Sequence, residues 1–354
     1  MAYDAVRFFD QVSLRTREEL MPDLWYSLYR VVILIDHFHN ELTLSGNFVD
    51  NNTDVALLDR IEKLLYRSKN INYSFSRVNG ETPNLSDTEF LDLVEKGIRH
   101  CHRGDVFQLV LSRRFSTAFR GDEFNVYRAL RSINPSPYLF YFDYGNFRIF
   151  GSSPEAQLCI RKNEAAVFPI AGTFRRTGDD AKDGALAEKL AADAKENAEH
   201  IMLVDLARND LSRHAGNVQV KVFREIQYYS HVIHLESKVT GTLTDPSCTI
   251  ELAAATFPAG TLSGAPKFMA VNLIDRYEPV NRSFYGGAIG YMGFTGDYNH
   301  AIMIRTFLSK DNTLIYQAGA GIVAESKPES ELQEVNNKLS ALRNAMQMAE
   351  TINR

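Results

Sequence analysis

The sequence predicts an α+β fold, a layered antiparallel sheet sandwich flanked by helices. Short segments of alternating polarity often follow one another with only a turn between them, as expected for hairpins. Helical segments occur at irregular intervals, so the chain lacks the βαβ alternation of a parallel sheet. With 354 residues and 45% hydrophobic composition, the chain is long enough to bury a large core.

The first part of the chain mixes both kinds of element. Residues 31–49 and 71–78 alternate as strands do, and a helical pattern around Leu57–Leu65 lies between them. Ser86 and Glu89 form the pattern of a capping box, which predicts a helix that continues to about His102. We place a boundary there, between residues 1–85 and 86–354.

Further elements follow in a regular order. Asp105–Phe115 is expected to be a strand, and Phe124–Ser132 a helix that the prolines of Asn134-Pro-Ser-Pro137 must end. Residues 138–175 are expected to form an antiparallel meander, and residues 183–213, rich in Ala, Leu, Glu and Lys, one long helix. The remaining predicted elements are strands at 218–224 and 229–241, helices at Pro246–Ala255 and Pro266–Arg276, strands near 286–294, 299–308 and 313–323, and a last helix from Lys327 with Ser326 as its N-cap.

Composition excludes several classes of protein. A net charge of −5 and a pI near 6.0 do not provide the basic surface of a nucleic-acid binder. Cys101, Cys159 and Cys248 lie far apart, which disfavours disulfides and zinc sites. No apolar run approaches the roughly 18 residues of a membrane span, and the N-terminus does not resemble a signal peptide. We expect a cytoplasmic protein that binds neither nucleic acid nor membrane.

Two predicted helices each carry a pair of glutamates three residues apart, Glu196/Glu199 and Glu331/Glu334. Residues at this spacing share one helix face, so each pair presents two carboxylates together. If the two faces converge, the carboxylates suit Mg²⁺, which takes one or two of them together with waters and substrate oxygens. The alternative is a solvated helix surface with ordinary salt bridges.

Other polar residues have two interpretations each. His234 is a core histidine or a general acid–base, and Glu155 is a strand-edge residue or a general acid. Arg305 and Lys338 lie in apolar surroundings, where cations need an anionic partner. Glycine-rich segments at 169–173, 259–267, 285–287 and 317–321 either make hairpin turns or let the backbone approach a ligand.

Several strings together resemble the family of chorismate-utilising enzymes. They are FQLVLSRRF, GSSPE, PIAGTFRR, EHIMLVDLARNDLSR, PAGTLSGAPK, GAIGYMGF, IMIRT and YQAGAGIVAES…ELQEVNNKLSALR, and they recur in the family's order from about residue 86 to 346. The resemblance implies stacked sheets flanked by helices, Mg²⁺ as cofactor and chorismate as substrate. The implied site residues are Glu199 and Glu334 as metal ligands with Glu196 and Glu331 beside them, Glu155 as general acid, His234 for pyruvate elimination and aromatisation, and Thr173, Ser263, Gly264, Arg305, Gly319, Gly321 and Lys338 around the substrate.

Two positions choose among family members. By the resemblance, Gln108 stands where the members of the family that use water have a lysine. A neutral amide cannot deprotonate water. Ala171 occupies the place of a lysine nucleophile in aminodeoxychorismate synthases, and alanine has no nucleophile. The resemblance therefore implies amination of chorismate by ammonia and pyruvate elimination to anthranilate. The alternatives are a synthase of 2-amino-2-deoxyisochorismate or 4-amino-4-deoxychorismate, and a non-catalytic chorismate-binding module.

The resemblance also concerns partners and regulation. Members of this branch receive ammonia from a separate glutamine amidotransferase subunit, component II. The segment Asn134, Pro135, Ser136, Pro137, Tyr138 resembles part of a tryptophan feedback pocket, with a plain double-proline turn as the alternative. Family members are longer at the N-terminus, so residues 1–85 are expected to be a remnant of the regulatory and sheet-forming portion.

Overall fold

The computed structural model describes the chain except residues 49–53, 68–72, 230–231 and 353–354, and the side chains of Thr173 and Pro246. Two compact units result. The first contains Met1–Asp23 and Ser74–Ile352, and the second contains Leu24–Tyr73. The predicted boundary between residues 85 and 86 stays a prediction; by compactness the chain divides after Asp23 and before Ser74.

The second unit is small. Strands β1 (Val31–Asp36) and β2 (Glu41–Gly46) form an antiparallel hairpin, followed by helix α1 (Val55–Leu65). Asp54 caps α1 by accepting a hydrogen bond from the Leu57 backbone N–H. None of its described residues is buried.

Two antiparallel sheets form the body of the first unit. The larger is an eight-stranded sheet in the order β13-β5-β17-β16-β7-β6, with β3 and β4 also pairing with β5. Its strands are β3 (Phe75–Arg77), β4 (Thr82–Pro83), β5 (Gln108–Gly121), β6 (Tyr138–Asp143), β7 (Phe147–Ser153), β13 (Gly264–Ala265), β16 (Thr306–Lys310) and β17 (Thr313–Ile322).

The second sheet has seven strands in the order β10-β12-β9-β8-β15-β14, with β11 also pairing with β12. Its strands are β8 (Ala156–Arg161), β9 (Glu164–Val167), β10 (Ile170–Arg175), β11 (Ala215–Tyr228), β12 (Val232–Leu243), β14 (Ala288–Met292) and β15 (Tyr298–Ile302). A buried cluster that includes Ile149 and Leu308 of one sheet and Ile289 and Ile302 of the other joins the two. The predicted sandwich of antiparallel sheets is therefore confirmed.

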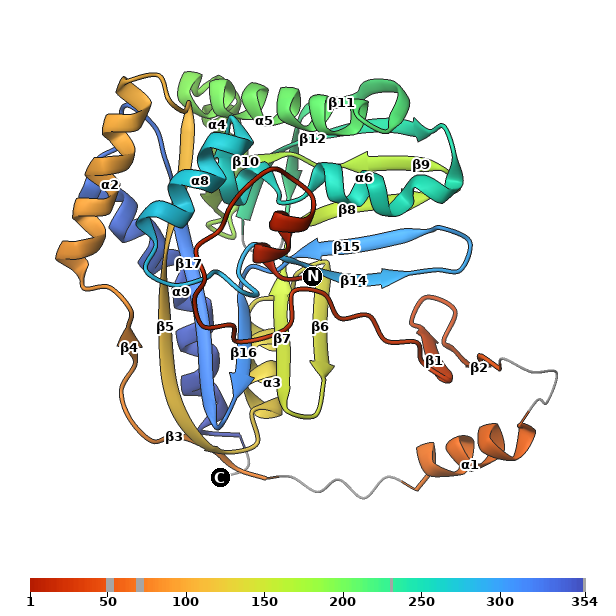
Figure 1. The fold of residues 1–354 in the computed structure, drawn as a ribbon. Coiled ribbons are helices and arrows are strands. Elements are labelled where there is room, and N and C mark those ends of the chain that lie inside the picture. Colours follow the sequence, from red (N-terminus) through yellow and green to blue (C-terminus); the bar gives the residue numbers. More distant parts are fainter. Residues whose placement is uncertain (49–53, 68–72, 230–231, 353–354) are drawn as a thin grey trace. The chain divides into compact units, whose positions relative to one another are not determined.

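Helices cover both sheets (Figure 1). Apolar side chains of α2 (Asp87–His102), α3 (Phe124–Ile133), α8 (Lys267–Tyr277) and α9 (Pro328–Ala349) share one buried core with β5 and β17. Those of α5 (Ala194–Ser212) and α6 (Thr249–Thr256) share another with β8, β9 and β12. The remaining helical segments are η1 (Tyr3–Phe8), α4 (Asp180–Ala192), η2 (Pro246–Cys248) and α7 (Gly260–Ser263). The capping box of Ser86 and Glu89 is present at the start of α2, as predicted.

The prediction of one helix over residues 183–213 was wrong. Two helices, α4 and α5, meet at Asp193, whose backbone leaves the helical region and whose carboxylate accepts hydrogen bonds from the Lys195 and Glu196 N–H groups. Aspartate is a strong N-cap, and its effect was hidden in a sequence otherwise rich in helix formers.

Two smaller predictions near the C-terminus also need correction. The strand predicted over 299–308 is two strands, and the chain crosses from one sheet to the other between β15 and β16. Arg305 lies at this crossing with a φ of +48°, a left-handed conformation that is uncommon outside glycine. The N-cap of α9 is Lys327 and not Ser326, whose hydroxyl instead accepts a hydrogen bond from the Val323 N–H.

Candidate active site

The sheet crossing at Arg305 places a cation close to the carboxyl of Glu155, which follows β7. Thr261 Oγ1 donates a hydrogen bond of 2.8 Å to Glu155 Oε1. Burial raises the pKa of Glu155 to about 7, although the charges of Arg305 and Lys338 and the Thr261 bond oppose this shift. A carboxyl with this pKa is partly protonated near neutral pH, as a general acid requires.

Arg305 has the features of an anion-binding group. Burial lowers the pKa of its guanidinium, and the nearby Glu155 and Tyr285 raise it again. Its guanidinium donates no hydrogen bond to the part of the chain that the structure describes. A cation in such surroundings needs an anionic partner, which a substrate carboxylate would provide.

The two glutamate pairs approach one another. Burial and the charges of Glu199 and, more weakly, Glu334 raise the pKa of Glu196, so α5 and α9 bring their acidic faces together. The pKa of Glu331 is raised by burial and by Glu334, although Ser326 lowers it. With an exposed fraction of 6%, Glu331 does not lie on a solvated surface, which argues against the salt-bridge alternative for this residue.

Within the described residues, no three acidic, histidine or cysteine side chains gather as a ready-made metal site. This is compatible with Mg²⁺, which needs only one or two protein carboxylates when water and substrate supply the other oxygens. Burial and neighbouring carboxylates raise the pKa of Glu196 and Glu331, and together with Glu199 and Glu334 they provide a set of hard oxygen donors suited to this cation. Lys338 Nζ contacts Glu334 Oε1 at 2.6 Å, so one cation already lies at the edge of the cluster.

Gln108 connects the acidic pairs to the glycine-rich strands. Its Nε2 donates a 2.8 Å hydrogen bond to Glu199 Oε1, while its carbonyl oxygen is buried without a partner among the described residues. A Cβ atom at Gly321 would lie 2.7 Å from Gln108 Nε2, and one at Gly264 would lie 2.2 Å from the Gln108 backbone oxygen. Gly264 is therefore needed to make room for the Gln108 backbone, whereas a side chain at Gly321 would displace the Gln108 amide. Ser263 donates its hydroxyl to the Ala259 oxygen, which fixes the turn before Gly264.

One residue facing this site was not predicted as a site residue. Tyr285 is buried, and its hydroxyl accepts a hydrogen bond from the Gly319 N–H. Burial raises the pKa of this hydroxyl, although the charge of Arg282 opposes the shift. The Gly319 oxygen accepts a 3.0 Å hydrogen bond from Lys338 Nζ. The segment 285–287 was expected either to make a turn or to approach a ligand through its glycines, and neither interpretation assigned a role to the tyrosine hydroxyl.

His234 lies on β12 opposite Thr173 of β10. Its Nδ1 contacts the Gly172 oxygen at 3.0 Å, and burial lowers the pKa of its imidazole. A proton held on Nδ1 makes Nε2 the basic nitrogen of the ring. The predicted role of the Thr173 side chain lies outside what the structure describes.

The predicted tryptophan segment connects α3 to β6. The Asn134 oxygen accepts a hydrogen bond from the Ser152 hydroxyl of β7, and Tyr138 begins β6 with its hydroxyl 3.6 Å from Cys159 Sγ. Pro135, Ser136 and Pro137 lie between them and end α3, as expected. The feedback role of this segment stays a prediction.

Comparisons with known proteins agree on the family. The profile of the family described as chorismate binding enzyme matches residues 1–344. The chain is 39% identical over 367 residues to anthranilate synthase component 1 of Aquifex aeolicus, covering 99% of this chain and 74% of that enzyme. It is 50% identical over 271 residues to anthranilate synthase component 1 of Geobacillus stearothermophilus, covering 76% of this chain but only 53% of that enzyme.

Solved structures extend the comparison to the fold. Anthranilate synthase component I from Streptococcus pneumoniae matches with a TM-score of 0.89 and 35% identity, over 97% of this chain and 79% of that one. The menaquinone-specific isochorismate synthase of Escherichia coli matches with a TM-score of 0.74 and 25% identity, over 83% of this chain and 68% of that one. No helix in the described ranges is long and apolar enough to cross a membrane. The match to the family profile and the identity to the relatives show that the chain belongs to the chorismate-binding enzyme family.

Proposed function

We propose that the chain acts as an anthranilate synthase component I and converts chorismate and ammonia to anthranilate, pyruvate and water. The relatives with 39% and 50% identity carry this name. Isochorismate synthases are also structural neighbours, so the fold alone does not choose between amination and hydration.

The environment of Gln108 is the observation that favours ammonia over water as the nucleophile. A water-derived nucleophile needs a base that removes its proton, and the Gln108 amide cannot act as one. Ammonia needs no such activation. The buried carbonyl oxygen of Gln108, without a described partner, is an acceptor suited to an ammonia N–H, and Nε2 is already bonded to Glu199.

The glutamate pairs are the groups that would hold magnesium, with Glu199 and Glu334 as ligands and Glu196 and Glu331 beside them. Magnesium, when bound, would provide positive charge next to the ring carboxylate of chorismate. The four carboxylates then fix where that end of the substrate lies. Their mutual repulsion without a cation, seen in the raised pKa values of Glu196 and Glu331, favours binding of one.

The other residues divide the remaining steps. The Glu155 carboxyl donates its proton to the hydroxyl that leaves C4 as ammonia attacks C2, which gives 2-amino-2-deoxyisochorismate and water. Arg305, Lys338 and the backbone of Gly319 to Gly321 hold the second carboxylate. His234 Nε2 then takes the C2 proton as the bond between ring C3 and the enolpyruvyl oxygen breaks, which makes the ring aromatic. The departing enolpyruvate takes up a proton at its methylene carbon and becomes pyruvate.

We further propose that ammonia is supplied by a separate glutamine amidotransferase subunit, component II. The three separated cysteines fit a reducing cytoplasm as the place of reaction. Tryptophan feedback through Asn134–Tyr138 belongs to the same proposal, because Asn134 and Tyr138 both contact strands that lead to the site.

The direct test incubates the purified chain with chorismate, Mg²⁺ and excess ammonium at mildly alkaline pH. Anthranilate is followed by its fluorescence, and all products are separated by chromatography. Anthranilate that requires both Mg²⁺ and ammonium supports the proposal. An aminated, non-aromatic product would instead indicate a synthase that stops at the intermediate, and unchanged chorismate would favour a binding module.

A further inference from the structure

A buried ion pair lies behind the substrate pocket, outside the groups assigned above. Glu278 caps the end of α8, and Arg282 follows it; their exposed fractions are 2% and 1%. Arg282 Nε and one terminal nitrogen donate to the two Glu278 oxygens at 2.9 and 2.6 Å. With Ser112 of β5, which also bonds Glu278, we call this group the Arg282 cluster.

The bonds of the Arg282 cluster lead to the backbone that lines the pocket. The remaining Arg282 donors reach the oxygens of Leu262 and, at 2.7 Å, Val110. Leu262 directly precedes Ser263 and Gly264, while Val110 pairs with Gly321 across β5 and β17. One guanidinium thus connects two separate parts of the pocket lining.

Glu278 makes the matching connection through Ser112. The N–H and the hydroxyl of Ser112 donate to Glu278 Oε1 at 2.9 and 2.7 Å. Ser112 pairs with Gly319, whose oxygen accepts the Lys338 bond. The cluster therefore determines where the Gly319 backbone lies.

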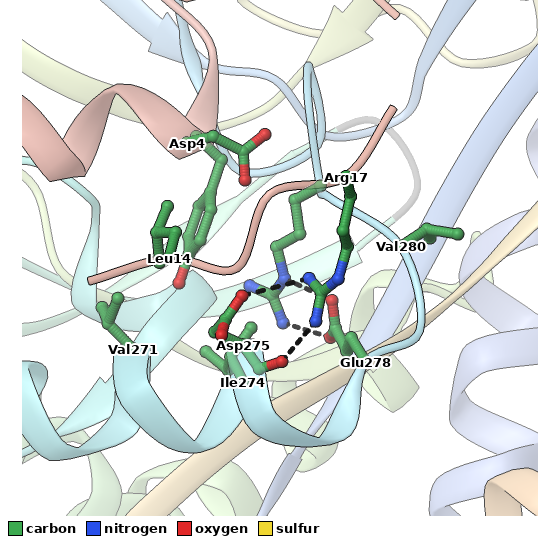
Figure 2. A pocket seen from close by; sticks show the side chains of 10 residues that line it. Asp4, Leu14, Arg17, Val271, Ile274, Asp275, Glu278 and Val280 are labelled. Atoms are coloured by element: carbon green, nitrogen blue, oxygen red, sulfur yellow. Dashed lines mark hydrogen bonds and ion pairs between the residues drawn. The ribbon is translucent and has the colours of Figure 1, made fainter. Parts of the chain in front are cut away.

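Two aromatic rings flank the guanidinium. Arg282 Cζ lies 4.7 Å from the centre of the Tyr3 ring and 5.5 Å from that of Tyr285, whose hydroxyl faces Gly319. A small cavity beside the pair is lined by Glu278, Arg17 and Asp275 (Figure 2), so the N-terminal segment closes the outer side of the cluster.

We propose that Arg282 and Glu278 are positioning residues for the carboxylate-binding side of the pocket. This inference rests on the proposed function. Arg282 touches no reacting atom; it acts through Gly319, Gly321, Tyr285 and the turn before Gly264. A disturbed cluster should weaken the binding of chorismate while leaving the glutamate pairs, which lie on α5 and α9, in place.

The chain contains a matched control for this proposal. Glu123 is also buried, and it accepts hydrogen bonds from Arg148 at 2.8 Å and from the Ser309 hydroxyl at 3.0 Å. Ser309 pairs with Arg148 at the beginning of β7, whereas Glu155 follows the end of that strand. A buried glutamate bonded to a serine and an arginine therefore also occurs away from the pocket, although the Arg148 side chain is 36% exposed and that of Arg282 only 1%.

The experiment compares Ser112→Ala with Ser309→Ala, and Arg282→Lys with Arg148→Lys. Lysine keeps the charge but loses the fork of donors that reaches two backbone oxygens. We expect Ser112→Ala to raise the KM for chorismate about tenfold, the effect of one lost bond to a buried charged group, and Arg282→Lys, which loses more than one bond, to raise it further. The Mg²⁺ concentration for half-maximal rate should stay at the wild-type value. Urea unfolding of all four variants shows how much of any effect is lost stability.

Equal KM values in the Ser112→Ala and Ser309→Ala variants, or a loss confined to kcat, would overturn the inference. A wild-type chain that forms no anthranilate would instead contradict the proposed function. In that case calorimetric titration with chorismate tests the inference by itself, because Ser112→Ala should weaken binding and Ser309→Ala should not.

Discussion

Glu155 and Glu278 are two glutamates in one compact unit with very different surroundings: Glu278 is buried, whereas Glu155 is only partly buried. Glu278 accepts four hydrogen bonds, two from Ser112 and two from Arg282. Glu155 accepts one side-chain bond, from Thr261, and burial raises its pKa to about 7. A buried carboxylate with enough donors stabilises the charged form, whereas one with few donors holds its proton. The number of donors therefore separates a structural carboxylate from one available for proton transfer.

The largest effect is expected from Glu278→Ala. The substitution leaves the Arg282 charge buried without its partner, which should lower the free energy of unfolding by about 3–5 kcal/mol. Urea denaturation followed by circular dichroism measures it. Asp205→Ala is the control, because the Asp205–Arg208 pair is more than half exposed and should contribute at most about 1 kcal/mol. Similar losses in both variants would remove the distinction drawn for Glu278.

Glu334→Ala, in contrast, should lower activity strongly and stability only slightly. Loss of a proposed metal ligand should lower kcat/KM about 100-fold or more, equivalent to about 2.7 kcal/mol of transition-state stabilisation. Stability should change little, because the lost Lys338 pair is nearly half exposed and repulsion of Glu331 is relieved. Glu329→Ala, an exposed residue in the first turn of the same helix, is the control and should keep full activity. Unchanged turnover in Glu334→Ala would contradict the magnesium assignment.

The sequence predicted features that depend on neighbouring residues, but not the long-range contacts that surround Glu278. Local signals were sufficient for the sandwich of antiparallel sheets, the capping box at Ser86 and the end of α3 before the two prolines. The Arg282 cluster left no such signal, because Ser112 and Glu278 are 166 positions apart and meet only in the folded chain. Long-range contacts of this kind have no period in the sequence.

Two features of the site were missed for local reasons. The strand predicted through 299–308 changes sheets at Arg305, and nothing in an alternating apolar pattern marks a left-handed arginine. Tyr285 was noted only as part of a glycine-rich segment, and the segment's two interpretations concerned the backbone and not the side chain. In contrast, the spacing of the glutamates left the convergence of the two pairs open and the resemblance implied it; the raised pKa values of Glu196 and Glu331 support it.

The pH dependence of stability sharpens the comparison through Glu155→Gln. The folded-state pKa of Glu155 is raised from 4.5 to about 7, so the folded protein binds this proton more tightly than the unfolded chain. Its contribution is present below the unfolded pKa and is lost as the pH rises through about 7. Between about pH 5 and 7.5 the wild type should lose about 2 kcal/mol more stability than Glu155→Gln. Urea titrations at both pH values measure this difference.

Glu278→Gln is the control for that comparison. If the free energy of unfolding changes equally between the two pH values in the wild type and in Glu155→Gln, the raised pKa of Glu155 is wrong. The Glu278→Gln variant should show the wild-type slope, whatever its absolute stability, because it leaves the Glu155 proton unchanged.

The smallest effect expected is stabilisation by Mg²⁺ itself. A cation bound only by the folded chain, at about ten times its Kd, should raise the free energy of unfolding by about 1.4 kcal/mol. Bound Mg²⁺ would relieve the repulsion between the glutamate pairs and so stabilise the folded chain. The carboxylate of Glu278 is already paired with Arg282 and should gain nothing from the cation. The melting temperature should therefore rise with Mg²⁺ in the wild type and in Glu278→Gln, but not in Glu334→Ala. Ca²⁺ and raised NaCl are the controls for ionic strength, and an equal rise in all three proteins would show that the cation acts elsewhere.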